Sequence, residues 1–474
     1  MALDTAMFET ITPSRFITFT IPNHFVSHHH HNQLLRVAVL DSPVQHADSP
    51  QVALMFVPKN REHDWIFSTE SGHLELLLSA HRISRLILMG DQPPDGSDSP
   101  IIYHRPAEND ASDQTRLEES VKPLVIALSR KFCFKNGIYD VPVLSYEDHI
   151  VSSVVLEKCI GDFVGEMIVE DVEIESDSNE YQKREFRRRL RFKRMPNLVQ
   201  TEVKIVPEKD FSLDSLRIGE KVKFRPDTRA LVHVYLVPMV ASCALIGSYI
   251  EERFQVGLRP KAMCVGVGGG ALISFLKTQL DFDVVGVEID KEVLRVARQY
   301  FGLVDGKFLR VCVEDAVQFM EKLAHQINRN DPDSFGACSE KDGYYLDNGD
   351  GLDAKFDVIM VDLDSNDARN GVSAPPLEFV KRNVLSAARL ILSDSGIFVI
   401  NVVPPNRSFY ETLIHRFREV FQELYEIDVG NGENFVLIAT MLSTVSSVGN
   451  SETKFLEKLK SVISGAYMDS IKKI

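Results

Sequence analysis

The chain has 474 residues, of which 44% are hydrophobic and 26% are charged. These fractions are close to the averages of globular proteins and exclude a fibrous or disordered chain, while the length predicts two domains. Asp and Glu outnumber Lys and Arg by 68 to 53, which gives a formal net charge of −15. A charge of this sign argues against a general nucleic-acid coat protein and favours basic or neutral partners.

The sequence has no feature of an exported or membrane-inserted protein. Its first residues, MALDTAMFETITPSRF, lack a basic region followed by an apolar core, and no apolar run approaches the roughly 18–20 residues of a membrane helix. The six cysteines are scattered without a CxxC pair, which predicts free thiols in a reducing compartment and no zinc site: Cys133, Cys159, Cys243, Cys264, Cys312 and Cys338. We therefore expect a cytoplasmic protein with no membrane partner.

The first half of the chain is expected to be rich in strands. Residues 1–32 look loosely organised and end in a run of histidines, which we interpret as an incidental polar tract because no acidic or Cys ligand is near. From there to residue 220, extended patterns such as LLRVAVL, QVALMFVP and RLILMG alternate with Asp, Ser, Pro and Gly. The sequence thus predicts a strand-rich α+β domain over residues 33–220, without a metal site.

A basic stretch, KREFRRRLRFKR, lies at residues 183–194 and fits a strand with one apolar and one basic face. It could be a docking surface for phosphate or an acidic partner. The interpretation that we favour is a solvated strand face, balanced by the acidic run EDVEIESDSNE at residues 170–180.

The second half, residues 221–474, changes to alternating strands and helices, which predicts a parallel sheet covered on both faces. Five such strands are followed by an antiparallel hairpin around Asn431-Gly432, a favoured turn pair. This is the layout of the Rossmann-like, seven-stranded α/β fold of class I S-adenosylmethionine methyltransferases. The polar, aperiodic stretch 326–355 is predicted to be a surface insertion.

A glycine turn follows the first of these strands, in MCVGVGGGALISFLKTQ. Gly266, Gly268 and Gly270 allow a tight turn and close approach of a ligand to the N-terminus of the next helix. The second strand ends in Glu288, whose carboxylate can accept hydrogen bonds from both ribose hydroxyls. Together these residues predict an adenosine-containing cofactor, although their spacing alone does not exclude NAD.

Carboxylates also follow the next two strands. Asp315 could bind an adenine amino group, or it could cap the following helix. Asp362 is the predicted catalytic residue, because a carboxylate at this sheet edge can steer an ammonium group in and accept its proton. Asp364 and Asp367 are alternatives for that role, with loop solvation and turn capping as the favoured interpretation. The stretch from Asn401 to two prolines is interpreted as a loop that closes the pocket.

The segments GVGGGALISF, VEID, VEDAVQF and DVIMVDLDSND resemble the nucleoside-binding and catalytic segments of the spermidine synthase-like methyltransferases. Flanking segments such as FVPKNREHDWIFSTESG extend the resemblance. From about residue 34 to near its end, the chain is similar to the C-terminal half of the methyltransferase-like protein 13 family. That family comprises lysine and N-terminal methyltransferases of translation elongation factor 1-alpha.

The resemblance implies the activity of the C-terminal half alone. S-adenosylmethionine would be the cofactor, and the substrate would be the N-terminal α-amino group of elongation factor 1-alpha. Asp362 aligns with an aspartate that handles an amine in aminopropyltransferases.

Two alternatives remain. An aminopropyltransferase would use decarboxylated S-adenosylmethionine, but its glycine turn usually carries an Asp (GGGDGG), which GVGGGALI lacks. A protein with this fold could also bind a partner without turnover. We further hypothesise that the strand-rich half recognises the body of the protein substrate, and we leave a homodimer open.

Overall fold

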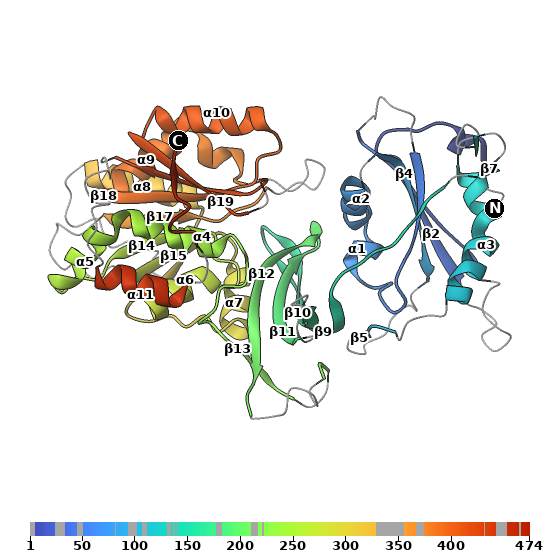
Figure 1. Cartoon of the computed structure of the whole chain (residues 1–474), viewed down its shortest axis with the longest axis horizontal. Coiled ribbons are helices and arrows are strands. Elements are labelled where there is room, and N and C mark those ends of the chain that lie inside the picture. Colours follow the sequence, from blue (N-terminus) through green and yellow to red (C-terminus); the bar gives the residue numbers. More distant parts are fainter. Residues whose placement is uncertain are drawn as a thin grey trace.

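The computed structural model describes residues 5–23, 34–44, 51–80, 82–92, 102–106, 111–129, 134–135, 138–139, 141–176, 183–209, 217–219, 222–328, 355–365, 374–430, 432–441, 453–463 and 466–474. Within these ranges the strands form three large sheets, of five, six and eight strands, and one pair. Figure 1 shows the six-stranded sheet between the other two large sheets. No helix among the described residues is both long and apolar enough to span a bilayer.

The five-stranded sheet forms an N-terminal unit together with the helices that cover it. Its strand order is β1 (Phe16–Pro22), β2 (Leu34–Asp41), β4 (Ile83–Asp91), β3 (Gln51–Phe56), β8 (Val143–Leu144). Helices α1 (Trp65–Ser68) and α2 (Glu70–Ser79) cover one face, while η1 (Thr5–Glu9) and α3 (Ala111–Leu128) cover the other. Because both faces are covered, the central strands β2 and β4 are almost continuously apolar.

The range 1–32, expected to be loosely organised, contains η1 and β1, and the Phe8 ring of η1 is fully buried. Trp65 lies in the core of the N-terminal unit with 8% of its surface exposed. The run of histidines lies outside the described residues. Two short paired strands, β6 (Phe134–Lys135) and β7 (Ile138–Tyr139), come between α3 and β8 in the chain.

The six-stranded antiparallel sheet, called here the bridging sheet, lies beside both neighbours. Its order is β13 (Phe224–Pro226), β12 (Met195–Pro207), β11 (Lys183–Phe192), β10 (Gly165–Ser176), β9 (Ile150–Gly161), β5 (Ile102–His104). Its apolar face, which includes Phe186 and Leu190, packs on Val293 and Val296 of helix α7 (Lys291–Tyr300). One helix therefore joins the bridging sheet to the eight-stranded sheet.

The basic stretch at residues 183–194 forms β11 and its turn, and most of its charge is paired within the protein. The antiparallel register places Asp171 opposite Arg188, and the two side chains form an ion pair of 2.6 Å. Arg191 pairs with Glu170 at 2.8 Å. The expected balance by acidic residues is confirmed, but the expected solvation is wrong for Arg188 and Arg191. They are only 7% and 6% exposed, because elements on both sides of the sheet cover them.

The eight-stranded sheet has the predicted α/β topology. Its order is β16 (Leu309–Val313), β15 (Asp283–Glu288), β14 (Lys261–Val265), β17 (Phe356–Val361), β18 (Leu392–Val402), β20 (Phe435–Thr440), β19 (Glu423–Asp428), β21 (Lys472–Lys473). The first five are parallel, and β19 and β20 form the expected antiparallel hairpin. These are the seven strands of the class I methyltransferase fold, and the two-residue β21 adds an eighth at the edge.

Helices cover both faces of this sheet, so its strands are buried on each side. One face packs on α4 (Leu236–Ala241), η4 (Ser242–Ile246), α5 (Gly247–Gln255), α6 (Ala271–Leu280) and α11 (Lys454–Val462). The other packs on α8 (Ala316–Asn328), η7 (Leu377–Val380), α9 (Arg382–Ile391) and α10 (Arg407–Arg418). Most of the expected insertion 326–355 lies outside the described residues, and the domain boundary near residue 220 stays a prediction.

Candidate active site

A cavity of about 360 Å³ opens at the carboxyl ends of β14, β15 and β17. The chain passes from β14 to β15 on one side and later to β17 on the other, so this edge is the point where the strand order reverses. Ligands of open α/β sheets bind at such a point. Residues of the bridging sheet, among them Phe192, Arg194, Gln200 and Thr201, line the opposite wall.

The glycine turn after β14 forms the floor of the cavity. Gly266, Gly268 and Gly270 have φ angles of 83°, 52° and 82°, a region that side chains rarely adopt. A Cβ on Gly266 would lie 2.3 Å from the carbonyl oxygen of Asp362, so this position also requires glycine for space. Gly270 begins α6 without a side-chain cap, which leaves the helix N-terminus available to a ligand.

Glu288 ends β15 beside this turn and is only 7% exposed. One carboxylate oxygen, Oε2, accepts hydrogen bonds from the amides of Val267 and Gly268 at 3.1 and 3.3 Å. The other, Oε1, accepts one from Asp290 at 3.2 Å. Burial raises the pKa of Glu288, and these backbone hydrogen bonds oppose the rise. The carboxylate is thus held rigidly in the cavity wall.

Asp315 lies after β16 and lines the cavity next to Glu314. Its Oδ1 accepts a hydrogen bond of 2.9 Å from the amide of Gln318, so it caps helix α8. The alternative interpretation of Asp315 as a cap is therefore confirmed. Contact with an adenine base stays a prediction, which its position in the lining permits.

Asp362 follows β17 directly and lines the cavity. Its Oδ2 accepts a hydrogen bond of 3.3 Å from the Tyr235 hydroxyl, and it is also hydrogen-bonded to the side chain of Asn401. Burial and the charge of Asp364 raise the pKa of Asp362 to about 7, against the opposing effect of those two hydrogen bonds. A carboxyl group with this pKa can exchange a proton near neutral pH.

Asp364 also lines the cavity, where its Oδ2 accepts a hydrogen bond of 3.0 Å from Gln200 on β12. Asp364 lies in a loop and is partly exposed, as the favoured interpretation expected, but it also belongs to the cavity wall. Strand β17 ends at Val361, and Asp362 and Asp364, which follow it two residues apart, both line the cavity. Asp367 lies outside the described residues.

Asn401, interpreted from the sequence as part of a closing loop, lies instead in β18, and its buried Oδ1 has no hydrogen-bond partner among the described residues. Three residues of the cavity lining, His233, Tyr235 and Thr201, were not found from the sequence. Tyr235 is stacked on His233 with 5.4 Å between ring centroids, and burial lowers the pKa of His233. Thr201 accepts a hydrogen bond from the amide of Gly269. The sequence around these residues did not indicate a site, because the groups that they contact lie far away in the chain.

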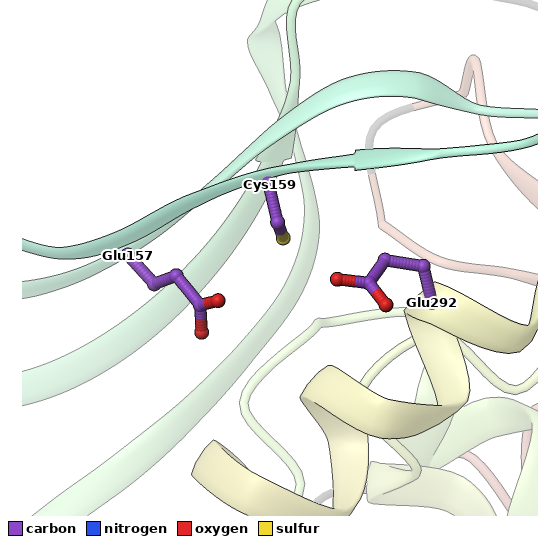
Figure 2. Close-up of side chains that lie close together, drawn as sticks. All are labelled: Glu157, Cys159 and Glu292. Atoms are coloured by element: carbon purple, nitrogen blue, oxygen red, sulfur yellow. The ribbon is translucent and has the colours of Figure 1, made fainter.

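A second cluster of polar side chains, Glu157, Cys159 and Glu292, lies outside the cavity between β9 and α7 (Figure 2). The Arg295 guanidinium donates hydrogen bonds to both carboxylates, at 2.7 and 2.8 Å, and so neutralises them. Burial and the two glutamates raise the pKa of the Cys159 thiol to about 11, so the thiol is protonated at neutral pH. The cluster is best explained as an ion-paired link between strand and helix.

No protein-family model matches the chain. The curated relatives include proteins named eEF1A lysine and N-terminal methyltransferase. The one from Xenopus laevis is 26% identical over 435 residues, which cover 88% of this chain and 54% of that protein. The human one is 25% identical over 419 residues, covering 85% and 53%. This chain therefore spans about half the length of the curated relatives it matches.

Among solved structures, human methyltransferase-like protein 13 in complex with SAH is 23% identical, with a TM-score of 0.38, over 50% of this chain and 94% of that one. A probable spermidine synthase from Corynebacterium glutamicum is 15% identical, with a TM-score of 0.40, over 67% and 89%. The resemblance inferred from the sequence is confirmed by the curated relatives: over most of its length, the chain is similar to proteins named eEF1A lysine and N-terminal methyltransferase.

Proposed function

We propose that the chain is an S-adenosylmethionine-dependent methyltransferase that modifies the N-terminal α-amino group of elongation factor 1-alpha. The observation that carries this proposal is the position of Asp362. A carboxyl group with a pKa of about 7 lies in one cavity with a glycine turn and a rigid acidic residue suited to a nucleoside. The similarity to curated proteins of that name supports the substrate.

The residues of the cavity fit this cofactor. Glu288 would accept hydrogen bonds from the ribose, and the glycine turn would lie against the amino-acid part. When bound, S-adenosylmethionine supplies a methyl group on a positively charged sulfur. The cavity suits such a cation because its lining contains six carboxyl groups: Glu288, Glu314, Asp315, Asp362, Asp364 and Glu378.

The same edge can hold an amine. An ammonium group has three N–H donors, and the carboxylates of Asp362 and Asp364, which both line the cavity, can accept hydrogen bonds from it. The amine reacts through its lone pair, so it must first lose a proton, and Asp362 is placed to accept it. The two hydrogen-bond partners of Asp362 keep its carboxylate oriented during this transfer.

The pKa of Asp362 favours an α-amine over a lysine side chain. An α-amino group has a pKa of about 7.7–8.0, roughly one unit above that of Asp362, whereas lysine lies at about 10.4. Proton transfer to Asp362 would therefore cost about 1 kcal/mol for the α-amine and about 4–5 kcal/mol for lysine. This difference supports the N-terminal activity as the one carried by this chain.

Intact mass spectrometry of an elongation factor 1-alpha N-terminal peptide, incubated with the protein and S-adenosylmethionine, tests the proposal. We expect added methyl groups on the free peptide, none on a peptide with an acetylated N-terminus, and none with Asp362→Asn. Putrescine with the decarboxylated donor serves as the second acceptor and donor pair. Aminopropyl product there, with an unmodified peptide, would reverse the assignment in favour of an aminopropyltransferase. A cytoplasmic location and a homodimer stay predictions.

A further inference from the structure

Arg194 stands apart from the other arginines of the basic stretch. The five others form ion pairs: Arg184, Arg187, Arg188, Arg189 and Arg191. Within the described part of the chain, Arg194 forms no ion pair or hydrogen bond, and its buried Nε has no partner. Its guanidinium lies over the Phe192 ring, 5.0 Å from the centroid, and both residues line the cavity.

The surroundings of Arg194 indicate that an anion belongs beside it. Among the described residues of the lining, it is the one lysine or arginine, facing six carboxyl groups. Burial lowers its pKa, while the more distant charges of Asp364 and Glu288 act in the opposite direction. A partly buried cation without a direct partner is costly, and a ligand carboxylate would remove that cost.

We infer that Arg194 binds the carboxylate of the donor's methionine part and thereby selects S-adenosylmethionine over its decarboxylated form. This inference rests on the proposed function. The nucleoside of the donor is neutral and its sulfur and amino group are cationic, so the amino-acid carboxylate is the one anionic group of the donor. A planar guanidinium is also the side chain best matched to a carboxylate.

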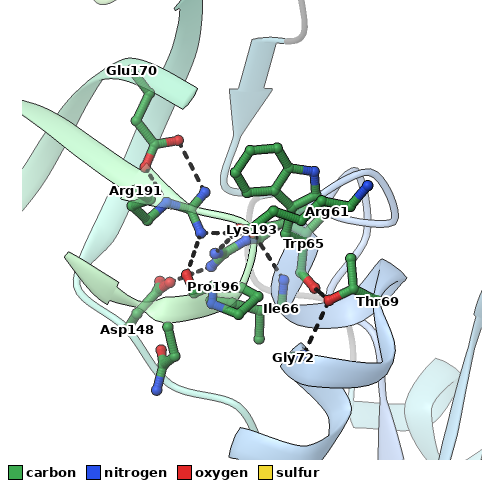
Figure 3. Close-up of polar contacts among 12 residues, drawn as sticks. Arg61, Trp65, Ile66, Thr69, Gly72, Asp148, Glu170, Arg191, Lys193 and Pro196 are labelled. Carbon is green, nitrogen blue, oxygen red and sulfur yellow. Dashed lines mark hydrogen bonds and ion pairs between the residues drawn. The ribbon is translucent and has the colours of Figure 1, made fainter. Parts of the chain in front are cut away.

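The turn that carries Arg194 is held in place by the N-terminal unit. Arg191 forms ion pairs with Glu170 of β10 and, at 3.0 Å, with Asp64 before α1, and it donates to the Pro196 carbonyl at 2.8 Å. Figure 3 shows Arg191 between Glu170 and Pro196, close to the helix of Trp65 and Ile66. These contacts fix both strands at the turn.

Two further contacts hold the turn itself. The Ser71 hydroxyl donates to the Lys193 carbonyl at 3.1 Å, and the Asn197 amide donates to Glu75 at 2.7 Å. Arg194 therefore projects into the cavity from a backbone that α2 holds on its other side. Such preorganisation lowers the entropy that ligand binding must remove.

Isothermal titration calorimetry with two nucleosides tests the inference without turnover. S-adenosylhomocysteine carries the carboxylate, and its decarboxylated analogue lacks that group alone. We expect the natural protein to bind S-adenosylhomocysteine about 10–100-fold more tightly, the range for a hydrogen-bonded charge pair. Arg194→Gln should abolish this preference by weakening only the carboxylate ligand. Arg194→Lys should retain part of it.

Lys193→Gln is the matched control, since it removes a positive charge from the same turn at an exposed position that pairs with Glu166. It should keep the full preference. If Arg194→Gln weakened the binding of both nucleosides equally, or of neither, Arg194 would not be the residue that binds the carboxylate. Equal affinity in the natural protein would overturn the inference alone. If the natural protein bound neither nucleoside, the proposed function would fail as well.

Discussion

The hydroxyl oxygen of Thr201 accepts a hydrogen bond of 2.8 Å from the amide of Gly269, 68 residues later in the chain. A Cβ on Gly269 would lie 2.6 Å from the Thr201 methyl carbon, so strand β12 lies directly against the glycine turn. The bridging sheet is therefore part of the cavity wall and not an independent attachment to it.

This contact predicts that Thr201→Val weakens cofactor binding. Valine keeps the shape but leaves the buried Gly269 amide unpaired, which costs about 1–3 kcal/mol of folding stability. Because the turn loses its support, we expect S-adenosylhomocysteine to bind about 3–10-fold more weakly in calorimetry. Thr201→Ser should restore both properties. Thr278→Val on α6 is the control, since it loses a hydrogen bond to the carbonyl of Ser274 and one from the exposed side chain of Gln279, and an equal effect there would contradict the prediction.

Asp362→Asn should remove activity and increase stability. Loss of a general base lowers the rate of methyl transfer by about 10²–10⁴-fold, while the affinity for S-adenosylhomocysteine should change little. The folded-state pKa of Asp362, about 7, lies above its ordinary value, so its contribution to stability is present at low pH and is lost as the pH rises through 7. The asparagine of the variant does not ionise, so the variant does not lose this stability as the pH rises.

Thermal unfolding at pH 4 and pH 8 measures the second effect of Asp362→Asn. The unfolding midpoint of the variant should exceed that of the natural protein at pH 8 by more than it does at pH 4. A variant that is less stable at pH 8, with normal cofactor binding, would show that the charge of Asp362 supports the fold.

Tyr235→Phe should move the pH profile of the reaction. The Tyr235 hydroxyl donates to Asp362 and lowers the pKa of that carboxyl group, so its removal raises the pKa further. The acid limb of kcat/KM, expected near pH 7, should shift upward by about 0.4–1 unit, the equivalent of one ordinary hydrogen bond. Tyr249→Phe is the control, since its hydroxyl donates to Asp357 away from the cavity. A shift in both variants, or in neither, would argue against Asp362 as the base.

Asp64→Asn should weaken both the fold and the cofactor site. Burial alone would raise the pKa of Asp64, but Arg191 and Arg61 outweigh it and hold the value at about 2. Its stabilising effect is present above its ordinary pKa and is lost as the pH falls toward 2. At pH 7 the substitution should cost about 3–5 kcal/mol, because Arg191 loses one partner of a buried pair.

Urea unfolding measures that cost, and calorimetry with S-adenosylhomocysteine should show weaker binding because the turn of Arg194 is less well held. Asp162→Asn breaks an ion pair with Lys291 between largely exposed side chains, and it should cost less than about 1 kcal/mol. Equal costs for the two variants would show that the link between the N-terminal unit and the bridging sheet adds little.

The sequence by itself determined the part of the site that lies on local elements. The glycine turn and Asp362 directly follow a strand and Glu288 ends one, and parallel strands bring their carboxyl ends to one edge, so spacing along the chain sufficed. The order of the sheet followed from the alternation of strands and helices and from the final hairpin.

Only the tertiary structure decided which residues form the opposite wall. Gln200 contacts a residue 164 positions away, and Tyr235 one 127 positions away, and no local periodicity encodes such pairs. The same holds for Arg194, because its neighbouring arginines in β11 carry the same charge. The antiparallel register pairs those arginines with acidic residues, and the packing of the turn on α2 leaves Arg194 at the cavity. The sequence gives the charge of each side chain, but the packing of the folded chain decides which charged side chains are paired.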